Sequence, residues 1–314
     1  MSKSTMKYIA KRLAIAAATL LIIVAILFLM LKLMPGTPFN DEKLTEAQRA
    51  AIYAKYGMDQ PIYVQFFTYL KNMLTGDFGT SFGISRNLPV SALVAPRIAI
   101  SFGIGIAAVI LGTIVGIGLG IFAALKRNTI GDTLATIFAV LGVSIPSFVL
   151  ALLLLLLFGV EIPVFPVLFD TNHMIRSSIL PVIALSFSVI ANVARFTRTE
   201  MIGVLGSDYI ALAEAKGLDK GTVIRKHAIR NTLIPVITIL GPILVNLMTG
   251  SMVLERIFGI PGLGSLLVNG ITVNDYNVVL AVAFLYSILY IVMMLIIDIS
   301  YGIIDPRIRL GKEA

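Results

Sequence analysis

The side chains that could carry chemistry are concentrated in one polar segment, Asp208–Asn231, with the sequence DYIALAEAKGLDKGTVIRKHAIRN. Asp208 can accept hydrogen bonds from the free N–H groups of a helix start, and Gly217 suits the left-handed position just past a helix end. Asp219 can cap a second helix that runs on toward Pro235. The segment therefore predicts a short helix, a tight turn and a second helix.

The short helix would carry few bulky side chains, because Ala211, Ala213 and Ala215 occupy much of it. Such a helix can approach another protein closely and lie in a groove on its surface. An ordinary solvated loop is the alternative interpretation of the same residues.

Residue types elsewhere exclude several kinds of chemistry. The chain has no Cys, which removes disulfides, thiolate metal ligands and cysteine nucleophiles. His173 with Asp170 offers only two ligand types in one loop, so we expect solvated loop residues and no metal site. An intramembrane serine protease would need a basic partner at membrane depth, and neither His173 nor His227 lies in an apolar run. We therefore expect no catalytic site.

The elements that must position the polar segment are strongly apolar. Of the 314 residues, 58% are hydrophobic and 13% charged, with a mean hydropathy of +0.95. Soluble domains are closer to half apolar and a quarter charged. The chain therefore belongs in a bilayer, and its net charge of +8 is explained by membrane orientation rather than by binding to nucleic acid.

Uncharged runs long enough to cross a bilayer occur six times. Each must be helical, because a lone strand would leave its backbone polar groups unpaired in lipid. We therefore predict an all-α, polytopic membrane protein with six transmembrane helices, at Leu13–Leu31, Ile98–Leu125, Thr133–Val160, Ser177–Ala194, Asn231–Leu254 and Tyr276–Ile297.

Lysine and arginine are far more frequent in alternate connecting segments, which is the positive-inside pattern. This asymmetry predicts that both termini and the polar segment are cytoplasmic. The first apolar run is too long for a signal peptide and no small-residue cleavage site follows it, so we expect it to remain as an anchor.

The predicted organisation has four parts. Residues 35–96 form an external segment with short amphipathic helices. The complete division is a cytoplasmic tail and first transmembrane helix (1–34), the external segment (35–96), a five-helix core (97–305) with a cytoplasmic loop (206–230), and a cytoplasmic tail (306–314).

The phrases YIALAEAKGL and HAIRNTLIPV resemble the cytoplasmic loop of ABC importer permeases of the dipeptide, oligopeptide and nickel type. Importers in general carry Glu-Ala-Ala before the loop glycine, and only Gly217 matches that pattern strictly. The loop motif of the peptide-type permeases is matched at Ala213, Ala215, Lys216, Gly217, His227, Arg230, Asn231, Leu233, Ile234 and Pro235. KLMPGTPF, YGMDQPIYVQF, LTGDFGTSF, GVSIPSF and ERIFGIPGLGSLLVNGI are also similar, in order, to the first of the two permease subunits.

The resemblance implies a type I permease bundle in the cell membrane. It implies a second homologous permease subunit, two cytoplasmic ATPase subunits that bind ATP and Mg, and an extracytoplasmic binding protein that delivers a peptide. This chain lacks a phosphate loop, so it is not the motor and no cofactor is expected in it. The residues expected to couple to the ATPase are Asp208, Tyr209, Ala213, Glu214, Ala215, Lys216, Gly217, Arg225, His227 and Arg230.

Three polar residues in the apolar runs are candidates to line the translocation pathway: Asn192, Arg195 and Asp298. Arg195 can instead extend to the membrane interface, and Asp298 can instead form a structural ion pair. Gly112, Gly116 and Gly120 form a small-residue stripe that favours close helix packing over a sliding contact.

The resemblance does not determine the substrate, because nickel chelates and glutathione-like peptides also use permeases of this pattern. A secondary transporter that works without ATP is the alternative outside it. Such a transporter would need ionisable residues inside its crossings to carry coupling ions, for which the sequence offers Asp298.

Overall fold

The computed structural model describes residues 3–33, 45–55, 57 and 59–304, with side chains included except at 3–10, 31, 48–49, 51–52, 55, 244–246, 248–251 and 296–304. These described residues form helices and no strand, apart from an isolated bridge between Thr80 and Pro89. The predicted all-α class is confirmed. The described residues divide into two compact units, 3–100 with 261–292, and 101–260 with 293–304.

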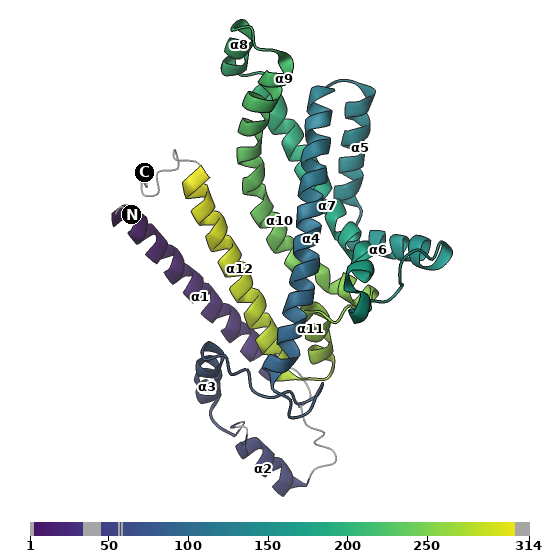
Figure 1. Cartoon of the computed structure of the whole chain (residues 1–314). Helices are drawn as coiled ribbons and strands as arrows, with labels where there is room; N and C mark the ends of the chain where they lie inside the picture. Colours follow the sequence, from purple (N-terminus) through teal and green to yellow (C-terminus); the bar gives the residue numbers. More distant parts are fainter. Residues whose placement is uncertain (1–2, 34–44, 56, 58, 305–314) are drawn as a thin grey trace. The chain divides into compact units, whose positions relative to one another are not determined.

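The first unit is held together by apolar side chains from five helices, and Figure 1 shows the course of these helices. Val94 of α4 packs with Leu266 of α11 and Val282 of α12. Val24 of α1 and Met73 of α3 form a second buried group. The helices of this unit are α1 (Lys3–Leu33), α2 (Glu46–Lys55), α3 (Ile62–Leu74), the start of α4 (Val90–Leu125), α11 (Leu263–Thr272) and the first part of α12 (Tyr276–Ile304).

In the second unit α7 is central and packs against α5, α6 and α10. Figure 1 shows α8 and α9 at one end of this unit, where the chain passes from α7 to α10. The elements are the rest of α4, α5 (Ile130–Ser144), α6 (Ser147–Leu155), a π-helical turn (Leu156–Glu161), a 3₁₀ turn (Thr171–His173), α7 (Met174–Leu205), α8 (Asp208–Ala215), α9 (Lys220–Thr222), a second π-helical turn (Val223–Ala228) and α10 (Ile229–Ile257).

Among the described residues, four helical segments are long and apolar enough to cross a membrane: Lys11–Met30, Val90–Leu125, Thr171–Leu205 and Tyr276–Leu295. A fifth crossing is counted if the bent pair α5 and α6 is taken as one span. The remaining predicted crossing, Asn231–Leu254, lies inside the continuous helix α10, several of whose side chains are outside the described part of the chain.

The predicted third crossing, Thr133–Val160, is bent into two helices. α5 ends at Ser144, and α6 leaves it at an angle of 100°. Pro146 is the cause, because the residue before a proline is pushed out of the helical region. Ile145 accordingly has an extended backbone (φ −81°, ψ 120°).

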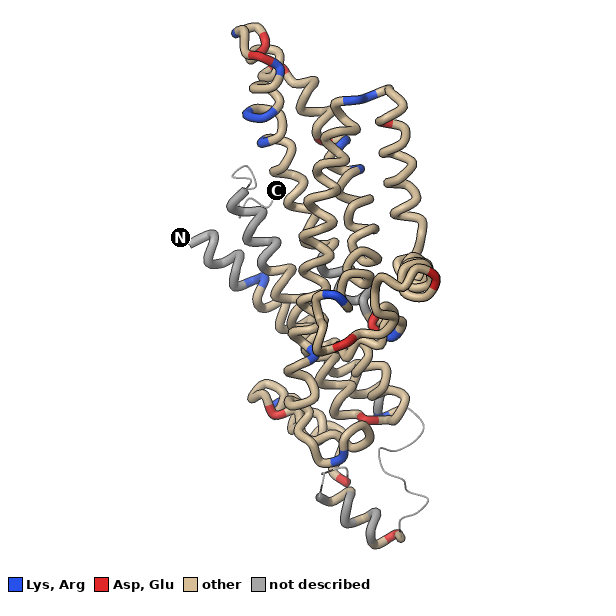
Figure 2. Tube along the Cα trace, turned by 45° about the vertical axis from the view of Figure 1, so that its right-hand side comes forward, with Lys and Arg blue, Asp and Glu red and all other residues tan. Residues whose placement is uncertain are grey.

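Positive charge in the second unit gathers at the end formed by α8, α9 and the α4–α5 turn (Figure 2). Lys126 and Arg127 lie in that turn, and Lys216, Arg225 and Arg230 lie in or near the polar segment. This is the end that the positive-inside pattern predicts to be cytoplasmic.

Candidate functional site

The polar segment forms a two-turn helix, a tight turn and a second helix. α8 begins after Ser207, whose extended backbone (φ −85°, ψ 152°) makes it the N-cap, so the predicted cap at Asp208 was one residue too late. Asp208 lies in the first turn, where a negative charge is favourable beside free N–H groups. The chain leaves α8 through Gly217 at φ +79°, a conformation that other residues adopt only with strain.

Asp219 begins the second helix as predicted. Its carboxylate accepts a hydrogen bond from the Thr222 N–H at 2.9 Å. The hydrogen bonds from the side chain and backbone of Thr222 lower the pKa of Asp219. From there the chain continues through α9 and the π-helical turn directly into α10.

The inner face of α8 is packed onto the ends of its neighbours. Ile210 and Ala213 are buried together with Met201 of α7 and with Val223 and Ala228 before α10. A short helix held by such a core cannot shift without moving the helices that form it. α8 is therefore mechanically connected to α7 and α10.

The outer face of α8 consists of Tyr209, Leu212 and Lys216, which lie three and four residues apart and so share one side of the helix. Tyr209 is 43% exposed and Leu212 is 56% exposed. The helix thus presents an aromatic ring and an aliphatic side chain at the most charged end of the unit. This arrangement is suited to contact with another protein.

Most of the residues predicted for coupling are exposed, and Ala213 is not. Ala213 is 6% exposed because it lies three residues after Ile210, on the inner face. It supports the outer face and does not form it. Leu212, which is outside the predicted set, is exposed on the same side of α8 as Tyr209, three residues earlier. The exposed members of the predicted set are Asp208, Tyr209, Glu214, Ala215, Lys216, Gly217, Arg225 and Arg230, and His227 is half-buried.

The link from α8 to α10 contains a buried polar contact. The Thr232 hydroxyl donates to the Ala228 carbonyl at 2.9 Å and lies 3.2 Å from the Met201 sulfur. Nearby, the Asn231 side chain donates to the His227 carbonyl at 2.9 Å. The contact of Thr232 with Met201 joins the start of α10 to α7, and Met201 also packs with Ile210 and Ala213 of α8.

A buried ion pair at the same end of the unit was missed by the sequence interpretation. Arg198 of α7 donates to Asp132 of α5 through Nε to Oδ1 at 2.5 Å and through Nη2 to Oδ2 at 2.7 Å. The Asp132 side chain is 7% exposed, and Oδ2 also accepts from the Asn128 N–H at 3.0 Å. The pair therefore fastens the α4–α5 turn to α7.

The three predicted pathway residues are not brought together among the described side chains. Asn192 donates to the Ser188 carbonyl of its own helix at 2.8 Å. Arg195 is exposed and borders a cavity of about 60 Å³, which Thr136 and Arg198 also line. Asp298 lies in α12, but its side chain is outside the described part of the chain. Their place in a pathway stays a prediction.

The glycine stripe of α4 is a packing surface, as predicted. A Cβ atom at Gly112 would lie 2.5 Å from the Cβ of Val189, and one at Gly116 would lie 2.8 Å from the Cβ of Val193. A contact this close is possible only without side chains on α4. The stripe therefore sets the approach of α4 to α7.

The loop between α6 and α7 contains the pair Asp170 and His173. The His173 Nδ1 atom lies 2.8 Å from the Asp170 carboxylate, and both side chains are largely exposed. The hydrogen bond from His173 lowers the pKa of Asp170. Within the described residues, no group of three or more metal-ligating side chains is present.

Two family profiles together match almost the whole chain. The family described as "Binding-protein-dependent transport system inner membrane component" matches residues 116–310, and its N-terminal counterpart matches residues 5–102. The family is a membrane component of transport systems and not a catalytic subunit.

Curated relatives match over nearly their full lengths. The chain is 44% identical to the dipeptide transport system permease protein DppB of Lactococcus lactis, with 97% of this chain and 99% of that protein aligned. It is 42% identical to DppB of Bacillus subtilis, covering 98% and 99%. It is 43% identical to the oligopeptide transport system permease protein OppB of Salmonella typhimurium, covering 97% and 99%.

The fold also resembles a solved structure, the crystal structure of an amino acid ABC transporter with histidines. The TM-score is 0.51 at 15% sequence identity, and the match covers 67% of this chain and 92% of that one. On the strength of the family profiles and the near-complete relatives, the chain belongs to the family of inner membrane components of binding-protein-dependent transport systems.

Proposed function

We propose that this chain is a transmembrane permease subunit of an ATP-driven importer of dipeptides or oligopeptides. Three relatives at 42–44% identity over nearly their whole lengths are named as permeases for such peptides. Identity at this level over the full chain supports the same class of substrate here.

The importer assembled around this chain has further subunits. A second, homologous permease completes the pathway, two cytoplasmic ATPase subunits bind ATP and Mg, and an extracytoplasmic binding protein delivers the peptide. The relatives' role as permeases supports this composition. No cofactor is assigned to this chain itself.

The observation that carries the coupling role is the structure of α8. Its outer face exposes Tyr209 and Leu212, whereas its inner face is buried against α7 and α10. A partner that binds the outer face can therefore displace both long helices through a rigid contact. Such a displacement is a rigid-body switch, which is how a bundle can alternate between two openings.

The charges around the outer face support a polar rim for this contact. Glu214 and Lys216 are exposed at its edge, and Arg225 and Arg230 lie on the following segment. An apolar centre with a charged rim is the usual anatomy of a protein interface. We assign the centre to Tyr209 and Leu212.

The test is uptake of a radiolabelled dipeptide into proteoliposomes that contain this chain with its partner subunits and binding protein. Uptake requires ATP on the ATPase side, and Leu212→Glu lowers it at least tenfold because a buried charge without a partner opposes docking. Leu212→Met keeps the apolar contact and retains uptake. Transport that continues without ATP, or that is unchanged in Leu212→Glu, would contradict the proposal.

A further inference from the structure

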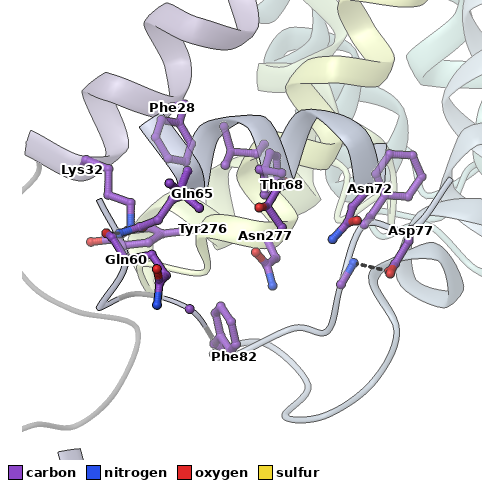
Figure 3. A pocket seen from close by; sticks show the side chains of 16 residues that line it. Phe28, Lys32, Gln60, Gln65, Thr68, Asn72, Asp77, Phe82, Tyr276 and Asn277 are labelled. Carbon is purple, nitrogen blue, oxygen red and sulfur yellow. Dashed lines mark hydrogen bonds between the residues drawn. The ribbon is translucent and has the colours of Figure 1, made fainter. Parts of the chain in front are cut away.

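A pocket of about 370 Å³ opens within the first unit (Figure 3). It lies between the end of α1, one side of α3, the segment 77–82 and the start of α12. Its volume falls in the range of small-molecule sites. None of the features assigned to coupling lies in it.

The side of α3 that faces the pocket is polar. Gln65, Thr68 and Asn72 line the pocket at the spacing of successive helical turns. Phe66 and Met73, on another side of the same helix, pack into the apolar core of the unit. The pocket side of α3 thus carries amide and hydroxyl groups beside Val64 and Tyr69, and another side of the helix is buried in the core.

Lys32 supplies a positive charge at one end of the pocket. Its ammonium lies 5.7 Å from the centre of the Phe28 ring, a favourable cation–π distance. It lies just beyond the candidate span Lys11–Met30, and partial burial lowers its pKa. No ion pair joins Lys32 to a carboxylate among the described residues. An anionic group of a ligand could pair with this ammonium.

Asp77 supplies a negative charge at the other end. Figure 3 shows Lys32 and Asp77 at opposite ends of the group of lining side chains, with Thr68 and Asn277 between them. One oxygen of Asp77 accepts from the Gly79 N–H at 2.9 Å. The side chain is exposed, so its second oxygen is accessible to a ligand.

The segment that carries Asp77 is held firmly against the start of α12. The Asn277 side chain donates to the Thr80 carbonyl at 2.8 Å, and Gly79, at φ +70°, lets the backbone pass close to Asn277. The buried Asp275 accepts from the Ser81 hydroxyl at 2.5 Å and from two N–H groups that follow it. The pocket is therefore preformed on this side.

The geometry points to a binding site for a small zwitterionic peptide on this unit, with the peptide carboxylate at Lys32 and its ammonium at Asp77. The Asn72 amide and the Asn277 amide oxygen lie between the two charges, where they can pair with the peptide main chain. The Gln65 and Asn277 amide N–H groups each already donate a hydrogen bond, to the Gln60 and Thr80 carbonyls. The choice of a peptide rests on the proposed function. A zwitterionic lipid headgroup has the same pair of charges, and the test separates the two.

The test uses the full chain, purified in nanodiscs of an anionic phospholipid and without a binding protein. Binding of radiolabelled alanyl-alanine is measured by equilibrium dialysis at neutral pH. Unlabelled alanyl-alanine, its N-acetyl form, its C-terminal amide and glycerophosphoethanolamine serve as competitors. The free dipeptide competes at least tenfold better than either blocked form, because each blocked form lacks one of the two charges.

Variants assign each charge to its residue. In Lys32→Gln the C-terminal amide competes as well as the free dipeptide. In Lys32→Arg the free dipeptide still competes better than the amide. Asp77→Asn keeps an acceptor for Gly79 but no longer distinguishes the N-acetyl form. Lys71→Gln and Glu46→Gln, at charged positions outside the pocket, stay within twofold of the wild type.

Three results would overturn the assignment: no binding of the dipeptide, equal competition by the blocked forms, or stronger competition by glycerophosphoethanolamine. The last would identify a lipid headgroup site. Uptake in proteoliposomes separates this inference from the proposed function. ATP-dependent dipeptide uptake together with any of these results would remove the pocket assignment and leave the importer intact.

Discussion

Arg198 on α7 donates two hydrogen bonds to Asp132 on α5, from Nε to Oδ1 at 2.5 Å and from Nη2 to Oδ2 at 2.7 Å. Two parallel hydrogen bonds between guanidinium and carboxylate are the strongest form of this contact and also set its orientation. The pair lies at the end of the second unit where α8 connects α7 to α10. The pair therefore fixes α5 against α7 at the end of the unit where α8 lies.

Removing Arg198 should destabilise the protein strongly. Arg198→Ala leaves the Asp132 carboxylate, which is 7% exposed, without its half-buried partner, and this should cost about 2 kcal/mol. The free energy of unfolding, measured by detergent titration in mixed micelles, is expected to fall by this amount. Arg195→Ala is the control, because Arg195 is exposed three residues earlier on the same helix. Equal losses of unfolding free energy in the two variants would show that the ion pair does not add to the stability of the protein.

The packing of α4 on α7 predicts opposite outcomes at two neighbouring glycines. Gly116→Ala places a Cβ 2.8 Å from the Cβ of Val193 and should cost about 2 kcal/mol through overpacking. Gly118→Ala has nothing within 4 Å of its new methyl group. It should change stability by less than about 1 kcal/mol, since alanine is the better helix former. Thermal unfolding of the two purified variants checks this difference, and a larger loss at Gly118 would contradict the packing.

The cap at Asp219 should make the start of α9 sensitive to acid. The pKa of this carboxyl is below its ordinary value of 3.8, so the charged form is stabilised by folding. Its contribution is complete above that ordinary value and is lost as the pH falls through the lower pKa of the folded state. Hydrogen-exchange protection of the Thr222 amide should therefore be constant near neutral pH and fall below about pH 4.

Asp219→Asn provides the control for this prediction. The neutral amide oxygen can still accept from the Thr222 N–H, but it does not titrate in this range. Protection at Thr222 should then be weaker and independent of pH. If Asp219→Asn kept the acid sensitivity of the wild type, another titrating group would be its cause.

The sequence allowed much of the fold to be predicted because lipid imposes a simple rule on apolar runs. The all-α class followed from run length, and two short helices, α2 and α3, lie within residues 35–96. The external location of this segment stays a prediction. The division of the chain at residues 34, 96 and 305 stays a prediction. The size of the 100° bend before α6 could not be predicted, because a proline inside an apolar run permits either a kink or a break.

The site was predicted less completely, for reasons of geometry. Gly217 and Asp219 were identified because turn and cap chemistry is local. Ala213, which is in the predicted set, is buried and Leu212, which is not, is exposed, because one residue changes the side of a helix by about 100°. Asp132 and Arg198 are 66 residues apart, so no local pattern could pair them.

The central claim is that another protein docks on α8, and thiol crosslinking tests it most directly. The chain contains no Cys, so Leu212→Cys and Ala215→Cys each introduce a single thiol on α8. Arg86→Cys, an exposed position in the segment predicted to be external, is the control. A bifunctional thiol reagent is added to membranes, and captured proteins are identified by mass spectrometry. We predict that both α8 variants capture an ATPase subunit with a phosphate loop and that the Arg86 variant does not. Capture of the ATPase from position 86, or none from α8, would contradict it.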